Sequence, residues 1–211
     1  MPNPKLAAPE VAAIEITGTT RQVFIMRSAL AAGTVYGLAS VGPFVSRAMA
    51  QEGGGDVEIL NFALTLEYLE AAYYKQALAE TKLASEVKSL ATEIQENEEA
   101  HVEALTVTIR DLGGEPVKAP GVDFGKAFAN EASFLELAQT LEDTGVSAYN
   151  GAAPAIESTE VLAAAGSIVQ IEARHAAAIR LLRDENPAPV GFDEALSTDE
   201  VLEAVMPFVK A

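Results

Sequence analysis

The sequence contains no cysteine and only two histidines among its 211 residues. Without cysteine the chain forms no disulfide, binds no metal through thiolates and has no cysteine nucleophile. Basic residues are also scarce, because 14 Lys and Arg stand against 31 Asp and Glu, which gives a formal net charge of -17. This acidity argues against a nucleic-acid-binding groove, which needs Lys and Arg to neutralise phosphates. Any metal must therefore be bound by oxygen atoms and imidazole nitrogens.

The composition is that of a folded globular protein, with 49% hydrophobic and 21% charged residues. The length suits one core of ordinary size with additional segments at the ends. No glycine-rich phosphate loop, Ser-His-Asp set or basic stripe is present. We expect one domain over residues 51–185, preceded by a distinct segment, residues 1–50, and followed by an extension, residues 186–211.

The first fifty residues differ from the remainder in charge, with four basic and two acidic side chains against ten and 29. Arg21 and Arg27 precede the uncharged residues 28–45, and the sequence AMA follows at residues 48–50. This order is typical of an export signal that ends at a small-residue cleavage site. We expect the export machinery to carry the protein to the periplasm or cell surface, with cleavage near Ala50. A membrane anchor and a retained structural helix are the alternatives, since the uncharged run approaches spanning length.

Apolar residues recur three and four positions apart in four long stretches, a periodicity typical of helices. Asp56 can cap the first helix, and Gly113-Gly114 is a common stop signal for the second. A further short helix is expected from about Ser197, capped by Ser197 or Thr198, with apolar residues that pack on the helices or on a partner subunit. The four long helices are predicted over residues 56–80, 83–112, 131–151 and 158–184.

The connections between these helices predict how they pack. The first and second helices, like the third and fourth, are joined by short segments and should be antiparallel neighbours. The 18 residues 113–130, with two prolines and four glycines, separate the two pairs. Fully extended they reach ~60 Å, against ~30 Å for a 20-residue helix, so this link can run the length of a bundle. The prediction is an all-α four-helix bundle with one long crossover.

Each histidine follows a glutamate by three residues, in the pairs Glu98 with His101 and Glu172 with His175. Residues three apart share one face of a helix, so each pair can direct an oxygen and a nitrogen at one point. A single pair of this kind is most simply a surface ion pair worth a few tenths of a kcal/mol. Two such pairs, on two different helices, favour a metal site if further carboxylates accompany them.

Glu67 and Glu142 are those further carboxylates. Both lie among apolar residues on predicted inward faces, where an acid is costly unless it binds a cation or is protonated. Each follows a leucine, precedes a tyrosine by seven residues (Tyr74 and Tyr149), and precedes the glutamate of the next Glu-x-x-His by 31 or 30 residues. The chain thus contains an internal repeat of helix pairs. The repeat predicts a two-fold pseudo-symmetric site for two metal ions.

Glu70 is an alternative to Glu67, because it lies on nearly the same face of the first helix, although only Glu67 keeps the seven-residue spacing to tyrosine. Tyr74 and Tyr149 are expected in the core, with a hydrogen bond to a ligand as the alternative. Four further acids of the second helix are expected on its solvated face: Glu93, Glu96, Glu99 and Glu103.

Residues 56–184 resemble the ferritin-like superfamily of dimetal-carboxylate proteins. The run ILNFALTLEYLEAAYYKQAL, residues 59–78, is similar to one branch of it, the ferritin-like domain proteins that include desiccation-related proteins, many with export signals. The resemblance implies a ferritin-like four-helix bundle that holds two Fe or Mn ions. The ligands it implies are Glu67, Glu98, His101, Glu142, Glu172 and His175.

Carboxylates and imidazoles suit Fe(II) or Mn(II), and we expect two ions roughly 3.5–4 Å apart that react with dioxygen or hydrogen peroxide. The expected function is oxidative or desiccation stress protection, by a ferroxidase, peroxidase or manganese-catalase-like activity. The alternatives are a non-enzymatic stress protein with a structural metal, and an iron-storage protein. A homo-oligomer formed through apolar helix faces or the C-terminal segment is a further expectation.

Overall fold

A computed structural model describes residues 55–210, so the predicted export segment lies outside the described residues. Within them the chain is all-α. Each long helix begins and ends within two residues of its predicted bounds, which confirms the periodicity argument. In the described part of the chain, no helix is both long enough and apolar enough to cross a membrane. The long helices are α3 (Gly55–Glu80), α4 (Ser85–Asp111), α5 (Glu131–Ala152) and α6 (Thr159–Leu182).

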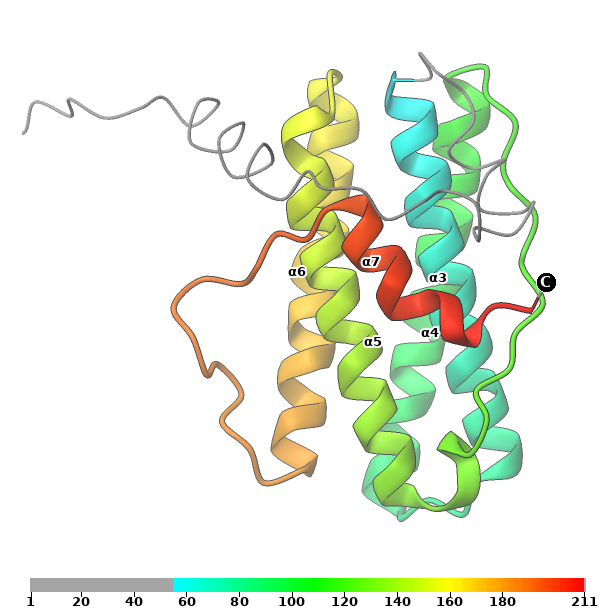
Figure 1. The fold of residues 1–211 in the computed structure, drawn as a ribbon, viewed down its shortest axis with the longest axis vertical. Coiled ribbons are helices and arrows are strands. Elements are labelled where there is room, and N and C mark those ends of the chain that lie inside the picture. The colour runs from blue at the N-terminus through cyan, green and yellow to red at the C-terminus, as the bar shows by residue number, and fades with distance from the viewer. Residues whose placement is uncertain (1–54, 211) are drawn as a thin grey trace, which may run out of the picture. The chain divides into compact units, whose positions relative to one another are not determined.

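The helices form a four-helix bundle in which α3 packs against α4 and α5 against α6 (Figure 1). The link from α4 to α5 runs along the outside of the bundle from one end to the other, which confirms the long crossover (Figure 1). It contains one 3-10 turn, Ala127–Ala129. Asn61 of α3 fastens the link, because its Nδ2 donates to the Glu115 carbonyl (3.2 Å) and its Oδ1 accepts from the Val117 N–H (2.8 Å).

The two predicted signals at helix ends have different outcomes. Gly113 ends α4 as expected: it adopts φ +80, a conformation that favours glycine, and its N–H donates to the Arg110 carbonyl at 2.9 Å. Asp56 is not the cap of α3, because the helix already begins at Gly55. Its carboxylate instead accepts from the N–H groups of Glu157 (2.7 Å) and Ser158 (2.8 Å) ahead of α6. The acid therefore joins α3 to the start of α6.

The C-terminal extension packs on the bundle of its own chain. Helix α7 (Thr198–Val205) lies across α5 (Figure 1), and the 3-10 turn that follows it (Met206–Phe208) contacts the α4–α5 link, where the Phe208 carbonyl accepts from the Asp123 N–H at 2.9 Å. Ser197 caps α7 as predicted, in a reciprocal capping box with Glu200. Val201 is fully buried in the bundle core. The apolar face of α7 is thus covered within the chain.

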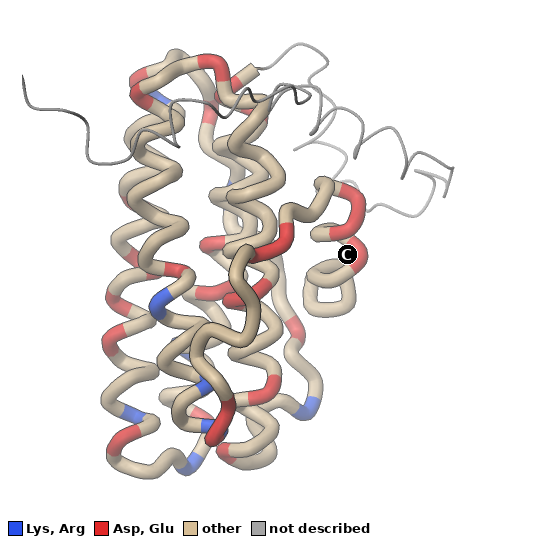
Figure 2. The backbone as a smooth tube through the Cα atoms, turned by 90° about the vertical axis from the view of Figure 1, so that its left-hand side faces the viewer, with Lys and Arg blue, Asp and Glu red and all other residues tan. Residues whose placement is uncertain are grey.

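The core of the bundle divides into two apolar clusters. One contains Val87 and Ile94 of α4 and Ile179 of α6. The other contains Leu105 of α4 and Ile168 of α6. The Glu-x-x-His segments lie between these positions on both helices. Figure 2 shows acidic residues at mid-height of the bundle as well as along its outside. The apolar clusters therefore enclose a polar layer.

Candidate metal centre

The structure brings all six sequence-predicted site residues together in this polar layer. Each of the four bundle helices contributes, with one glutamate from α3 and one from α5, and a Glu-x-x-His pair from α4 and one from α6. All four glutamates are 0% exposed, and the histidines are 8% and 5% exposed. Surface ion pairs are excluded by this burial. The six residues are Glu67, Glu98, His101, Glu142, Glu172 and His175.

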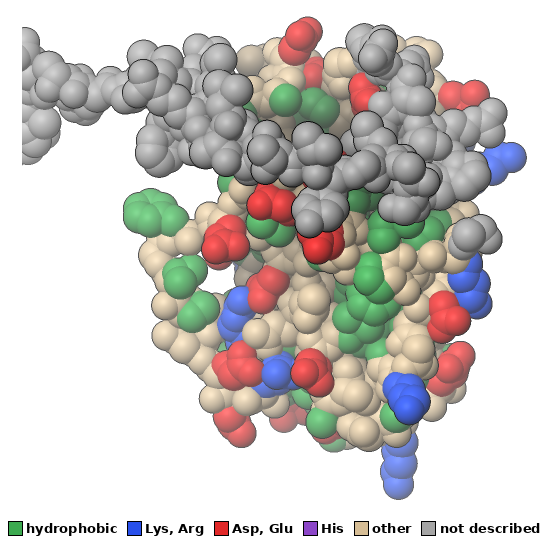
Figure 3. All heavy atoms as spheres, viewed as in Figure 1, with side chains coloured by type: hydrophobic (Ala, Val, Ile, Leu, Met, Phe, Trp, Pro, Cys, Tyr) green, Lys and Arg blue, Asp and Glu red, His purple; other side chains and the backbone are tan. Residues whose placement is uncertain are grey.

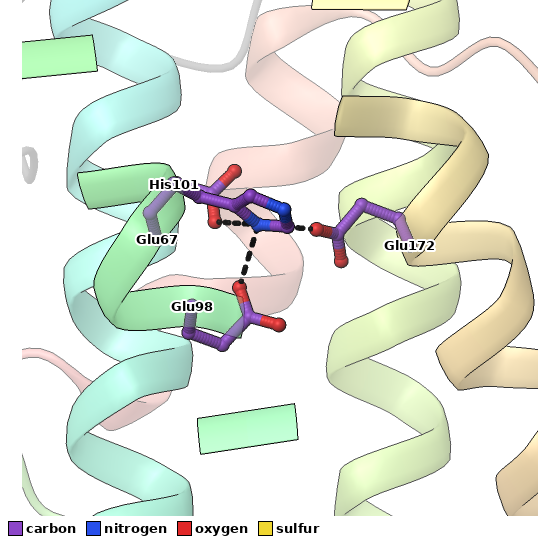
Figure 4. A group of neighbouring side chains, drawn as sticks. All are labelled: Glu67, Glu98, His101 and Glu172. Carbon is purple, nitrogen blue, oxygen red and sulfur yellow. Dashed lines mark hydrogen bonds and ion pairs between the residues drawn. The ribbon is translucent and has the colours of Figure 1, made fainter. Parts of the chain in front are cut away.

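The first group surrounds His101 (Figure 4). Its Nδ1 lies 3.2 Å from Glu67 Oε2, 3.2 Å from Glu98 Oε2 and 3.0 Å from Glu172 Oε1. Three carboxylates from three different helices therefore point at one ring nitrogen. We call the space between these four side chains the His101 position.

The second group surrounds His175 in the same manner. Its Nδ1 lies 3.1 Å from Glu98 Oε1, 3.2 Å from Glu142 Oε2 and 3.9 Å from Glu172 Oε2. We call this space the His175 position. Glu98 and Glu172 belong to both groups, each with one oxygen toward either histidine, whereas Glu67 and Glu142 each belong to one. This is the two-fold arrangement that the internal repeat predicted, with Glu67 rather than Glu70 in the group.

The donor atoms of the layer fit a pair of cations. A ring nitrogen carries at most one hydrogen, yet each Nδ1 faces three carboxylates. Glu98 Oε1 and both oxygens of Glu172 accept no hydrogen bond, although the histidine nitrogens are close to them. Buried carboxylate oxygens without donors are costly unless a cation compensates them. Divalent metal ions, bound by the convergent oxygen and imidazole lone pairs, would provide that compensation.

The sequence profile of the ferritin-like domain matches residues 55–185, which is more than half of the chain. The chain belongs to the ferritin-like domain family. No curated protein matches it. The matched range begins with α3 and ends just after α6, so it covers the four bundle helices and all six clustered side chains of this ferritin-like domain.

Burial and mutual contacts set the charges of the ferritin-like site. Burial works against a charged imidazole, but the contacts of His101 with Glu172, Glu67 and Glu98 outweigh it and raise its pKa to about 12. Corresponding contacts raise the pKa of His175 to about 12. Both histidines are therefore protonated at neutral pH in the metal-free protein, and a metal ion bound to Nδ1 would displace one proton from each ring.

The carboxylates divide into two kinds by protonation. Burial, and then the charge of Glu172, raise the pKa of Glu67 well above its usual range. Burial also raises the pKa of Glu142, against the effect of its contact with the nearby histidine. For Glu98, contacts with the two histidines outweigh burial and bring the pKa to about 2. The shared Glu98 is thus an anion in the metal-free protein, whereas Glu67 and Glu142 favour a proton.

The two tyrosines of the internal repeat, Tyr74 and Tyr149, each donate a hydrogen bond to a clustered glutamate on the other tyrosine's helix. The Tyr149 hydroxyl of α5 donates to Glu67 Oε1 of α3 at 2.5 Å, and the Tyr74 hydroxyl of α3 donates to Glu142 Oε1 of α5. Both rings are buried, so each tyrosine is a core residue and a hydrogen-bond donor to a clustered glutamate. These bonds leave the Oε2 atoms of Glu67 and Glu142 free to face the histidines.

Asn97 and Glu70 complete the surroundings of the site. Asn97 Nδ2 lies 3.1 Å from His175 Nε2, the ring nitrogen that faces away from the carboxylates. The sequence carried no signal for this contact. Glu70 is 2% exposed, and burial, followed by the charge of Glu172, raises its pKa well above the usual range. It lies beside the cluster but outside both groups.

The site is almost entirely buried, with only small parts of the His101 and His175 side chains exposed. Among the described residues, no histidine is visible on the face drawn in Figure 3. A cavity of about 20 Å³ lies between α3, α5 and α6, and its lining is apolar apart from Tyr149. No glutamate lines it, and Tyr149, whose hydroxyl donates to Glu67, is the one lining residue bonded to the cluster. The four acids expected on the outside of α4 are exposed, as predicted: Glu93, Glu96, Glu99 and Glu103.

Proposed function

We propose that the polar layer binds two Fe or Mn ions and that the protein reacts with dioxygen or hydrogen peroxide at this pair. Glu67 and His101 would hold one ion, Glu142 and His175 the other, and Glu98 and Glu172 would be shared. The observation that carries the proposal is the convergence of three buried carboxylates on each histidine Nδ1 atom. A site of purely structural ion pairs has no need of acceptor oxygens that lack donors.

The charges of the layer support a pair of divalent ions. Four ligand carboxylates supply about four negative charges, which balance two divalent ions in an interior of low dielectric constant. When bound, Fe or Mn supplies the electrons and the open coordination positions for reaction with dioxygen or peroxide. The residues of the chain orient this chemistry: Tyr74 and Tyr149 fix Glu142 and Glu67, and the apolar clusters exclude water.

We further propose that this activity protects an exported compartment from oxidative or desiccation stress. The support is the basic-apolar-AMA order of residues 1–50 together with the oxidant chemistry that such a metal pair provides. Mass spectrometry of the native protein from the exported fraction tests the export step. A mature chain that begins at Gln51 is expected, whereas an intact Met1 or Pro2 there would contradict cleavage.

Metal analysis tests the centre itself. Protein purified without chelators should contain close to two Fe or Mn per chain, and Glu98→Ala or His175→Ala should lower this content. Glu99→Ala is the matched control, because Glu99 neighbours Glu98 on the same helix but is exposed. Wild-type protein that binds no metal after exposure to Fe(II) and Mn(II) would refute the proposal.

Turnover separates the proposed activity from a structural metal. The loaded protein should consume hydrogen peroxide, or oxidise Fe(II) with dioxygen, and Glu98→Ala should abolish the reaction while Glu99→Ala retains it. Stable metal binding without either reaction would favour the structural alternative. Size-exclusion chromatography addresses iron storage, because a monomer or dimer cannot enclose a mineral core.

A further inference from the structure

The repeat that builds the site also shows where its two halves differ. Glu67 and Glu142 correspond to each other, as do the two Glu-x-x-His pairs and the two tyrosines that bond crosswise. A strictly two-fold arrangement would give both ions the same surroundings. Two departures from this symmetry lie next to the clustered side chains, and both are on the side of the His175 position.

The first departure concerns Glu70. It follows Glu67 by three residues on α3, and the residue that follows Glu142 by three on α5 is Gly145. A Cβ atom at Gly145 would lie 3.1 Å from Glu70 Oε1 and 3.6 Å from Glu172 Oε2. The Glu70 carboxylate therefore lies in the space that the missing side chain leaves, beside Glu172.

The surroundings of Glu70 indicate which position it serves. Glu172 Oε2, the oxygen next to this space, faces His175 at 3.9 Å, whereas Glu172 Oε1 faces His101 at 3.0 Å. The Glu70 side chain is 2% exposed and lies on the side of Glu172, a carboxylate whose two oxygens accept no hydrogen bond. Two acidic side chains buried near each other are costly unless a cation or a proton compensates them. The Glu172 oxygen beside Glu70 is therefore the one that belongs to the His175 position.

The second departure concerns Asn97. It precedes Glu98, whereas Ile171 precedes Glu172 in the other half. The Asn97 amide contacts the outer nitrogen of His175, Nε2, at 3.1 Å, and an isoleucine has no such group to offer to His101. Metal binding through Nδ1 places a hydrogen on Nε2, which the amide oxygen accepts after an amide flip. This contact orients the imidazole at the His175 position only.

We infer that Glu70 is a fifth carboxylate of the centre and binds the ion at the His175 position, so that the two ions are held with unequal affinity. The inference rests on the proposed metal pair and adds a ligand to it. Gly145 is the position that makes room for this carboxylate, and Asn97 supports the histidine of the same position. The Glu70 carboxylate adds a ligand oxygen for a cation there, whereas Gly145, the equivalent residue in the other half, has none to offer.

The test isolates each position with a histidine variant. In His101→Ala the His175 position remains, and Glu70→Gln added to it should weaken Mn(II) binding by about 10- to 100-fold. In His175→Ala the His101 position remains, and Glu70→Gln should change Mn(II) binding less than about threefold. Isothermal titration calorimetry gives the Kd values, and the electron paramagnetic resonance signal of free Mn(II) counts bound ions independently. Glu80→Gln, an exposed change on the same helix, is the matched control.

A second variant keeps the inference testable if Glu70→Gln does not fold. Gly145→Ala should push the Glu70 carboxylate away and weaken the same ion, whereas Gly166→Ala, a helical position with nothing within 4 Å of an added Cβ, should not. If the wild-type protein binds two Mn(II) ions but Glu70→Gln affects both positions equally, or neither, the role of Glu70 is wrong while the metal pair stands. Wild-type protein that binds no Mn(II) overturns the metal pair and this inference together.

Discussion

Replacing Tyr149 by phenylalanine removes one oxygen atom from the boundary between the core and the site. The hydroxyl donates to Glu67 Oε1 at 2.5 Å, and both residues are buried, at 7% and 0% exposure. Without the hydroxyl, Glu67 Oε1 has no donor in a place from which water is excluded. A buried acceptor that loses its only donor lowers the free energy of unfolding by about 1–3 kcal/mol. The packing of the ring does not change, so it does not offset this loss.

This cost appears in two measurements. Urea unfolding of chelator-treated protein should give a lower midpoint for Tyr149→Phe at an unchanged m-value, because the folded surface does not change. The melting temperature should fall by roughly 2–4 °C per kcal/mol for a domain of this size. Since Glu67 would hold a metal ion, Mn(II) affinity should also fall by about 10- to 100-fold.

Tyr68→Phe is the matched control, because the Tyr68 hydroxyl makes no hydrogen bond within residues 55–210 and the residue is only partly buried. It should leave the urea midpoint and the Mn(II) affinity unchanged. Tyr74→Phe, the symmetry-related change at Glu142, should behave as Tyr149→Phe does. If Tyr149→Phe unfolds at the same urea concentration as Tyr68→Phe, the hydroxyl does not stabilise Glu67 and the reasoning is wrong.

The sharing of carboxylates and the protonation of the histidines can each be measured. Glu172 belongs to both groups and Glu142 to one. Glu172→Gln should therefore reduce the Mn content of both positions, whereas Glu142→Gln should retain one ion. Atomic absorption measures the Mn content, and equal losses in the two variants would contradict the sharing. The pKa values of His101 and His175 are raised to about 12, so at neutral pH both rings must release a proton when Nδ1 binds metal, in addition to any proton released by Glu67 and Glu142. Protons thus compete with metal for the imidazole nitrogens, and the Mn(II) Kd should fall as pH rises, about tenfold per pH unit for each proton released. Calorimetry in buffers of different ionisation enthalpy counts the released protons. A Kd that does not change with pH would exclude this exchange.

The helices and the six clustered residues were predictable because their signals are local. A period of 3.6 residues, the glycines at 113 and 114 and the cap at Ser197 each describe a few neighbouring residues, and these fix helix bounds to within two positions. The cluster was predictable for a related reason. Acids on apolar faces are rare, and their repetition beside the only two histidines of the chain indicates one shared site.

Other features of the site depend on how the helices rotate against each other, which no local pattern encodes. The crosswise bonds of Tyr74 and Tyr149 need α3 and α5 to face each other at one height, and the contact of Asn97 with His175 needs a particular rotation of α4 against α6. The role of Asp56 also depends on tertiary structure. Its position in the sequence suits a helix cap, but its carboxylate accepts hydrogen bonds from the backbone ahead of α6. Tertiary proximity outweighs local preference in these cases.

The placement of the acids between two apolar clusters separates the source of stability from the source of function. The clusters contain the large buried side chains of all four helices, so they hold the helices in register whether or not metal is bound. The layer between them buries four glutamates completely, which opposes folding in the absence of metal. Under the proposed function, this costly layer serves binding rather than stability. The metal-free bundle should therefore stay folded with its ligands already in place, unlike small domains that fold only around their metal.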